Sequence, residues 1–397
     1  MERPFVFSKA PPNFGGVFYF ASASERFHAI YGQARMFFIA SMLFSSIKLL
    51  AYAAFIVLAL AGFGFYLAAR HGWMRNGYFR IPAVILLVIA LFIAFQGLGN
   101  GAMLATIGIH ITRHPVAALT INGLAEITVM LLGTILISRG ARQKLLAVFR
   151  LEGLRETPVL PYFLAIPIIL VAQIAGSAVS TLWERLWKFF PHLYSVLDKY
   201  ETASDTTMQG LVTATGLLDL ALILLFVAIV PALAEETLFR GFAQTNIERS
   251  GRWHARPYTA LFVASLLFAM MHGSLFKLPG LFVLGYTIGW MTYRTNNLFV
   301  GGVGHAVNNG FIVAALYLSP RMTSKASAGL VGSGGISATD ALSMLALIIP
   351  VLAVLLYFFV RATAGLSARG NAEREIQARL WEPNMFQPNN PPDTHPY

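Results

Sequence analysis

Long apolar segments recur along nearly the whole chain, separated by short polar or charged stretches. A helix that crosses the hydrocarbon of a bilayer needs about 20 consecutive apolar residues, and most of the segments have that length. They predict nine membrane-spanning helices, at residues 49–69, 81–103, 117–138, 159–182, 211–248, 257–278, 280–296, 299–318 and 341–360. The expected fold class is an all-α, polytopic transmembrane helical bundle of about eight to nine spans.

The same pattern divides the chain into five regions. Residues 1–48 are a partly aromatic lead-in that we place at the membrane surface, and no removable signal peptide is expected there. Residues 49–210 form an amino-terminal transmembrane region with no recognised motif, which ends in the longest polar connection. The remaining regions are a core with polar motifs, a loop with the last helix, and a tail with a disordered end, at residues 211–320, 321–360 and 361–397.

Composition supports a membrane protein and excludes several functions. The chain has 397 residues, of which 56% are hydrophobic and 12% charged, whereas about a quarter of the residues of a soluble domain are charged. The formal net charge of +11 is spread over the loops, so we expect a lipid bilayer and no nucleic acid as partner. Cysteine is absent, which excludes disulfides, thiolate metal sites and cysteine nucleophiles.

The charges of the loops predict an orientation. The loops at 70–80, 139–157 and 249–256 and the tail are basic, whereas the other described connections are balanced or nearly uncharged. Basic loops are retained on the cytoplasmic side. We therefore expect the carboxyl terminus in the cytoplasm.

Two adjacent glutamates follow a very apolar run at 220–230. A charged side chain in the middle of a spanning helix costs about 3 kcal/mol and is by default a functional-site hypothesis. Glu236 and Arg240 are four residues apart on one helical face and can pair, while Glu235 points elsewhere. Glu235 is thus the candidate for chemistry. The alternative is that both glutamates only mark the cytoplasmic end of the helix.

Two histidines occur in the spans that follow. Phe268 and His272 share a helical face, as do His305 and Asn309, because each pair is four residues apart. A single histidine in a membrane helix is more often a hydrogen-bonded interior residue than a ligand. The glycines before His305 would let neighbouring helices approach closely, which explains the small residues but not the polar pair.

Depth along the helices relates the first two motifs. Glu235 lies 14 residues from Arg249, or roughly 21 Å at the helical rise. His272 lies 16 residues from Arg256, or roughly 24 Å. The two side chains can meet, whereas His305 joins them only through tilt or an earlier helix start. Such groups can activate water and stabilise an oxyanion, and a divalent metal such as zinc could serve the first purpose.

In order and spacing, these motifs resemble the EExxxR, FxxxH and HxxxN motifs of the CPBP family. Its members are intramembrane proteases related to the CAAX-prenyl endopeptidases and to bacteriocin-processing and immunity proteins. The matching segments are 235–240, 268–272 and 305–309, and the stretch 284–298 resembles the family's connection between its last two motifs. The resemblance covers about residues 215–320, a quarter of the chain.

The resemblance implies an intramembrane endopeptidase, either a metalloprotease or a glutamate-dependent peptidase, in a bacterial inner membrane. It assigns catalysis to four side chains: Glu235, His272, His305 and Asn309. The first two would position and deprotonate the attacking water, directly or through a metal held by Glu235, His272 and His305; the last two would stabilise the oxyanion. Three further side chains would support them: Glu236, Arg240 and Phe268. The absence of cysteine and of an HExxH motif favours the glutamate mechanism.

Two other classes of function remain open at this point. One is a non-catalytic bacteriocin-immunity or scaffolding protein descended from such proteases, in which the polar groups persist as a packed network. The other is a secondary transporter with a proton site at Glu235, which predicts internal repeats that we do not find. The expected partner of an endopeptidase is a peptide or a membrane protein; the sequence specifies neither its prenylation nor the oligomeric state.

Overall fold

In the computed structural model, the described residues are 72–75, 77–107, 113–212, 216–250, 256–318 and 337–366. The expected lead-in at 1–48, the expected first span at 49–69 and the tail beyond 366 lie outside them. The described part is helical except for its connections and one short hairpin, in which β1 (Met74–Arg75) pairs antiparallel with β2 (Tyr78–Phe79).

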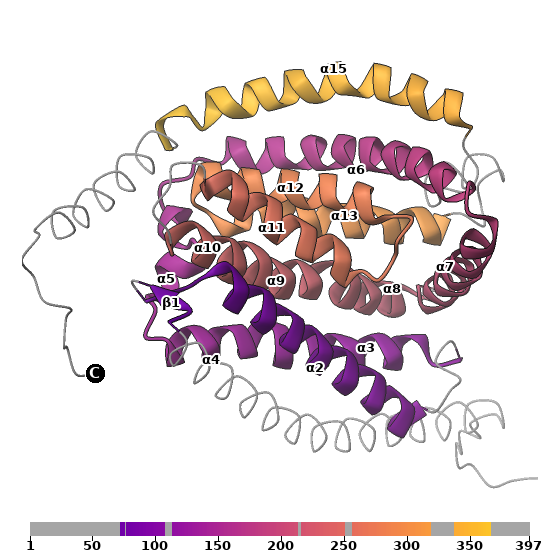
Figure 1. Ribbon diagram of the computed structural model, residues 1–397, viewed down its shortest axis with the longest axis horizontal. Coiled ribbons are helices and arrows are strands. Elements are labelled where there is room, and N and C mark those ends of the chain that lie inside the picture. The colour runs from indigo at the N-terminus through magenta and orange to yellow at the C-terminus, as the bar shows by residue number, and fades with distance from the viewer. Residues whose placement is uncertain are drawn as a thin grey trace, which may run out of the picture. The chain divides into compact units, whose positions relative to one another are not determined.

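The helices follow one another with short connections (Figure 1). In chain order they are α2 (Ile81–Ile107), α3 (Pro115–Glu126), α4 (Gly133–Gly140), α5 (Leu145–Val148), α6 (Leu160–Trp187), α7 (Pro191–Leu211), α8 (Leu217–Leu224), α9 (Val230–Glu236), α10 (Thr245–Arg249), α11 (Arg256–Met271), α12 (Leu278–Thr295), α13 (Leu298–Leu318) and α15 (Ala338–Ala362). Three π-helical segments, Ile127–Leu132, Leu225–Ile229 and Thr237–Gln244, join α3 to α4 and α8 through α9 to α10.

Six helices of the described part are long and apolar enough to cross a membrane. They span Ile81–Met103, Pro115–Gly140, Leu160–Trp187, Leu217–Arg249, Leu298–Tyr317 and Ala338–Ala362. They lie where the apolar segments predict spans, so the all-α fold class of a membrane protein is confirmed. The total of eight to nine spans stays a prediction, because the segment 49–69 is outside the described residues.

The span predicted at 211–248 begins later than expected. Leu211 is the last residue of α7, and the next helix starts at Leu217 after Gly216, whose backbone is extended. The polar connection predicted at 184–205 is also largely wrong, because α7 occupies most of it. Apolar side chains recur in α7 every three to four residues, at Leu193, Val196 and Tyr200, and they are exposed. A helix with so narrow an apolar stripe does not register as a span.

The span predicted at 257–278 is too long, because α11 ends at Met271. Gly273 has a φ of +67°, a conformation that glycine adopts without steric cost and that commonly ends a helix. Its N–H group donates to the Met270 carbonyl at 3.1 Å, which closes the last turn. His272 therefore follows the end of a helix and is exposed, instead of lying inside a spanning helix.

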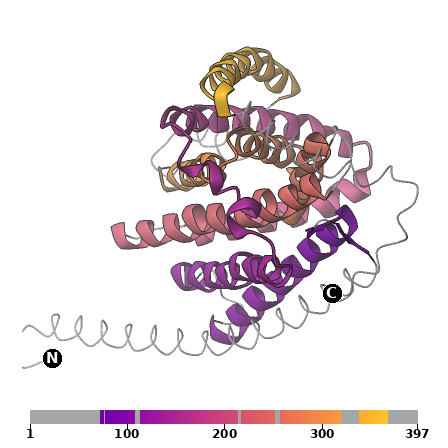
Figure 2. The same ribbon diagram turned by 90° about the vertical axis from the view of Figure 1, so that its left-hand side faces the viewer.

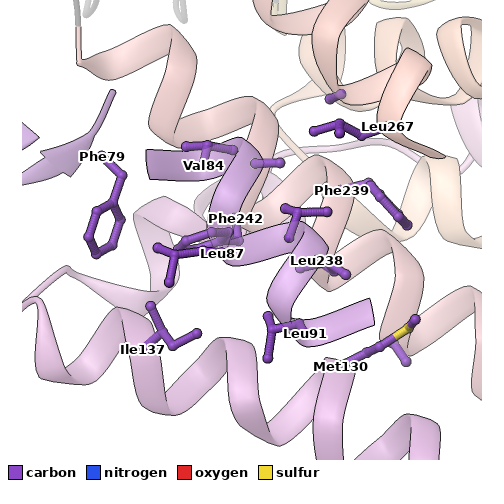
Figure 3. Close-up of a cluster of buried hydrophobic side chains, with 14 of the residues drawn as sticks. Phe79, Val84, Leu87, Leu91, Met130, Ile137, Leu238, Phe239, Phe242 and Leu267 are labelled. Atoms are coloured by element: carbon purple, nitrogen blue, oxygen red, sulfur yellow. The ribbon is translucent and has the colours of Figure 1, made fainter. Parts of the chain in front are cut away.

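The helix that carries the two glutamates packs its apolar side against α2, α4 and α11. Figure 3 shows Leu238, Phe239 and Phe242 meeting Leu87 and Leu91 of α2 and Ile137 of α4 in one buried cluster. A second buried cluster joins α6, α12, α13 and α15 through Ile168, Ile288, Val300 and Phe359. Figures 1 and 2 show α15 against α6 alone, so its remaining surface is left for lipid. The polar motifs lie between these two clusters.

Helices α6 and α12 approach closely at two glycines. A Cβ atom on Gly176 would lie 2.8 Å from the carbonyl oxygen of Gly280, and a Cβ atom on Gly280 would overlap the Gly176 carbonyl and Ser180 Oγ. The Gly280 N–H group donates to Ser180 Oγ at 3.1 Å. Small residues therefore fix the distance between these helices, as they do at many membrane helix interfaces.

We expect Gly280→Ala to lower the free energy of unfolding by about 1–3 kcal/mol, because the added methyl group forces two backbones apart. The measurement is denaturant-induced unfolding of the purified protein in mixed micelles. Gly97→Ala in α2 is the matched control, since its Cβ atom would meet nothing within 4 Å. Equal unfolding of the two variants would contradict the proposed close contact.

Candidate active site

Glu236 is the centre of a buried hydrogen-bonded network. Its Oε1 atom accepts hydrogen bonds from Arg240 Nη1 at 2.9 Å and from His305 Nδ1 at 2.8 Å. The three side chains are 1%, 1% and 2% exposed. The predicted pairing of Glu236 with Arg240 is thus confirmed, and His305 is added to it. We call these three residues the Glu236 network; it links the helix of the first motif to α13.

Arg240 also binds α12 and α11. Its Nη2 atom donates to the Gly285 carbonyl at 3.0 Å, and its guanidinium group lies 4.4 Å from the ring centroid of Phe268. A Cβ atom on Gly285 would lie 2.8 Å from Phe268 Cδ1 and 3.4 Å from Arg240 Nη2. Glycine at this position therefore gives the guanidinium access to the backbone, and one cation fastens three helices.

Phe268 brings both histidines to the same place. Its ring is fully buried and lies 4.7 Å from the ring of His272 and 5.8 Å from the ring of His305, between centroids. The predicted shared face of Phe268 and His272 is confirmed. Phe239 closes the opposite side at 5.5 Å, edge to face. The second and third motifs are therefore held together by an aromatic ring and not by a direct contact between histidines.

His272 is oriented by its own helix. Its Nδ1 atom lies 2.8 Å from the Phe268 carbonyl oxygen, which can only accept a hydrogen bond. The hydrogen is therefore on Nδ1, and Nε2 of the neutral ring is left as an acceptor. In this tautomer, Nε2 can accept a proton or a hydrogen bond from water.

The loop that follows His272 is fastened to α7. Ser274 Oγ lies 2.7 and 2.8 Å from the two carboxylate oxygens of Glu201, and the Phe276 N–H group donates to the same carboxylate at 3.4 Å. The first turns of α7 are held in turn by Tyr194, whose hydroxyl donates to Glu184 of α6 at 3.0 Å. Burial and this hydrogen bond raise the pKa of Tyr194 to about 12, so it remains a donor at neutral pH.

His305 and Asn309 lie together on α13, as their spacing predicts. Because His305 Nδ1 donates to the Glu236 carboxylate, its Nε2 atom accepts from Asn309 Nδ2, at 3.3 Å. Asn309 Nδ2 also donates to the Val227 carbonyl at 3.1 Å. Asn308, which is buried, donates to Asn309 Oδ1 at 3.3 Å. Both amide hydrogens of Asn309 are thus directed and its oxygen is held.

Glu235 differs sharply from its neighbour Glu236. Its Oε2 atom is buried and has no hydrogen-bond partner in the described part of the chain. Glu235 interacts electrostatically with Arg240, yet the guanidinium donates to Glu236 and Gly285. No hydrogen bond joins Glu235 to His272, His305 or Asn309 among the described residues. The carboxylate is therefore beside the Glu236 network without belonging to it.

The donors expected for a metal are not arranged as a ligand set. Both ring nitrogens of His305 are engaged, by Glu236 and by Asn309. Among the described residues, no group of three His, Asp or Glu side chains is placed to hold a metal ion. The residues as arranged do not fit a site built from Glu235, His272 and His305, so we derive no step through a metal.

Three supporting residues were missed by inspection of the motifs. Gly285 was noted only as part of a family-like connection, although its carbonyl binds Arg240. Glu201 is part of a charged loop by sequence and becomes an anchor only through tertiary contact. Glu126 offered a clear signal, because it is the only charged residue of the apolar segment 117–138, and an ionisable residue inside a span is rarely without a role.

Residues 217–311 match the family model of the Rce1-like proteins, described as type II CAAX prenyl endopeptidases. The match begins at the start of α8 and ends within α13. It includes all four residues expected to act in catalysis: Glu235, His272, His305 and Asn309. No curated protein and no solved structure matches the chain. The resemblance to the CPBP family is confirmed by the match, and at residues 217–311 this chain carries a domain of the Rce1-like, type II CAAX prenyl endopeptidase family.

Proposed function

We propose that the chain is an intramembrane endopeptidase in which Glu235 activates the attacking water. The observation that carries the proposal is the contrast between two adjacent carboxylates. Glu236 is fully committed to Arg240 and His305, whereas Glu235 Oε2 has no partner among the described residues. A buried carboxylate is costly without a partner, and substrate or water would supply one. The family of the domain implies a protease, which agrees with this chemistry.

Glu235 and His272 divide the activation of water between them. The Glu235 carboxylate takes a proton from water as the water oxygen attacks the carbonyl carbon of the scissile bond. Nε2 of His272, which the Phe268 contact leaves as an acceptor, binds the second hydrogen and orients the nucleophile. When the C–N bond breaks, the proton on Glu235 passes to the departing amine nitrogen.

Asn309 and His305 stabilise the tetrahedral oxyanion. One hydrogen of Asn309 Nδ2 turns from His305 Nε2 to the oxyanion, while the bond to Val227 keeps the amide in place. A proton on His305 Nε2 then provides a second donor, and the Glu236 carboxylate at Nδ1 balances the charge of the imidazolium. Donors held in advance stabilise charge that develops in the transition state.

The substrate class follows from the membrane and the family. The six apolar helices and the protease domain make the chain an integral membrane protein. His272 lies at a helix end and is exposed, so the peptide bond would reach the site from the side of the loop at 272–277. We propose a membrane-associated peptide with a carboxyl-terminal CAAX sequence, prenylated on its cysteine, as the substrate.

The test is cleavage of a fluorogenic CAAX peptide by the purified chain in lipid vesicles, with prenylated and unprenylated forms of one peptide. We expect His272→Ala to lower kcat by about 10²–10⁴-fold, the usual contribution of a general acid or base. His192→Ala, an exposed histidine of α7, is the matched control. Cleavage by His272→Ala at the wild-type rate would refute the role of His272. Absence of cleavage by the wild type would favour a non-catalytic immunity or scaffolding protein.

A further inference from the structure

Glu126 is a buried carboxyl group outside the family motifs. It is the last residue of α3, immediately before the π-helical segment Ile127–Leu132, and it is 3% exposed. Its neighbours Ala125, Val129 and Met130 belong to the apolar cluster of Figure 3. It makes no hydrogen bond or ion pair with any other described residue. An ionised carboxylate in such surroundings would be very costly.

The packing of the helices places Glu126 beside Glu235. The helix that contains Glu126 and the helix of the glutamate pair run in the same direction. At one end Gly123 packs against the ring of Phe226, and further along Met130 and Leu238 lie in the same cluster (Figure 3). Glu126 lies between Gly123 and Met130, as Glu235 lies between Phe226 and Leu238. The two carboxyl groups interact electrostatically.

The charges near the two carboxyl groups do not balance if both are ionised. Arg240 interacts with Glu235 but already compensates Glu236 at 2.9 Å. Helix α2 and the segments 127–132 and 225–229, which pack against α3, contain no titratable side chain. Helix α8 carries Asp219, and α7 carries several charged residues; Glu235 is the titratable group that interacts with Glu126. Two facing carboxylates in a low-dielectric site hold one proton between them.

We propose that Glu126 is a positioning residue that shares one proton with Glu235 and so keeps the Glu235 carboxylate ready to accept the proton of water. This inference rests on the proposed function. In the resting site the proton resides on Glu126, whose O–H group donates to Glu235. When Glu235 takes a proton from water and later delivers it to the amine, Glu126 returns to its starting state. The two carboxyl groups behave as one unit with two macroscopic titrations.

The first test is the pH dependence of kcat/KM for the CAAX peptide. Above the second titration the pair loses its shared proton, and two facing anions disfavour the developing oxyanion; the wild type should therefore show an alkaline limb. Glu126→Gln keeps the shape and an N–H donor but removes this titration. We expect it to retain activity within about tenfold and to lose or displace the limb. Glu184→Gln, a buried glutamate of α6, is the matched control and should keep the wild-type profile.

A second measurement does not require activity. The infrared spectrum of the purified protein near pH 7 should contain the C=O band of a protonated carboxyl group. We expect the band in the wild type and in Glu184→Gln and its loss in Glu126→Gln. An active wild type whose pH profile is unchanged by Glu126→Gln would overturn the proposal. A missing band in the wild type would also overturn it. A wild type that shows the band but cleaves nothing would refute the proposed function and leave the carboxyl pair established.

Discussion

Replacement of Glu235 by glutamine is expected to lower kcat by about a thousandfold, while the variant folds and unfolds like the wild type. The amide has the shape of the carboxylate but cannot accept the proton of water. Because Glu235 Oε2 has no partner among the described residues, the substitution breaks no hydrogen bond of the fold. The measurements are cleavage of the CAAX peptide in vesicles and denaturant-induced unfolding in micelles.

Two other variants make this result specific. Glu152→Gln replaces a half-exposed glutamate whose contact with Arg249 is long, at 3.9 Å, and should change neither property. Glu236→Gln should reduce activity and stability together, because it removes the acceptor of both Arg240 and His305. If Glu235→Gln cleaved the peptide at a rate near that of the wild type, Glu235 could not be the base.

The contrast between the two glutamates was accessible from the sequence because it depends on local geometry. Residues four apart share a helical face, so the pairing of Glu236 with Arg240 and the stacking of Phe268 with His272 follow from spacing alone. Three π-helical segments did not disturb this agreement, although one of them contains Arg240. π-Helical turns are frequent at functional sites, but no feature of the apolar pattern announces them.

Other features depended on contacts between distant segments. Nothing local indicates that the Gly285 carbonyl receives Arg240, or that Glu201 holds the loop after His272. The end of α11 was misplaced because an apolar count continues past Gly273, whereas the chain turns there with a positive φ. Helix α7 was missed because it is too polar to cross a bilayer. Hydropathy therefore located the spans well and the ends and interfacial helices poorly.

Glu126 illustrates a different kind of error. The rule that a charge inside a span is functional drew attention to Glu235, and it applies equally to Glu126. The residue was passed over because the segment 117–138 has no family motif. The amino-terminal region thus contributes at least one polar group beside the motif helices, so its function is more than structural support if the proton-sharing pair is correct.

Loss of Arg240 should have the largest effect on stability. We expect Arg240→Met to lower the free energy of unfolding by about 3–5 kcal/mol, because removal of one partner leaves a buried, uncompensated charge. Methionine keeps much of the volume beside Phe268, so the loss would come from the charge and from the hydrogen bonds to Glu236 and Gly285. Unfolding by denaturant in mixed micelles measures it.

The double variant Glu236→Gln with Arg240→Met separates charge from packing. Without the carboxylate, no buried anion is left unpaired, so the double variant should be more stable than Arg240→Met alone. Arg249→Met is the control, because Arg249 is 24% exposed and its salt bridge to Glu152 is long, at 3.9 Å; such pairs contribute about 0–1 kcal/mol. If Arg240→Met unfolded like Arg249→Met, the Glu236 network would not hold the three helices together. His305 would then need another explanation for its orientation toward the site.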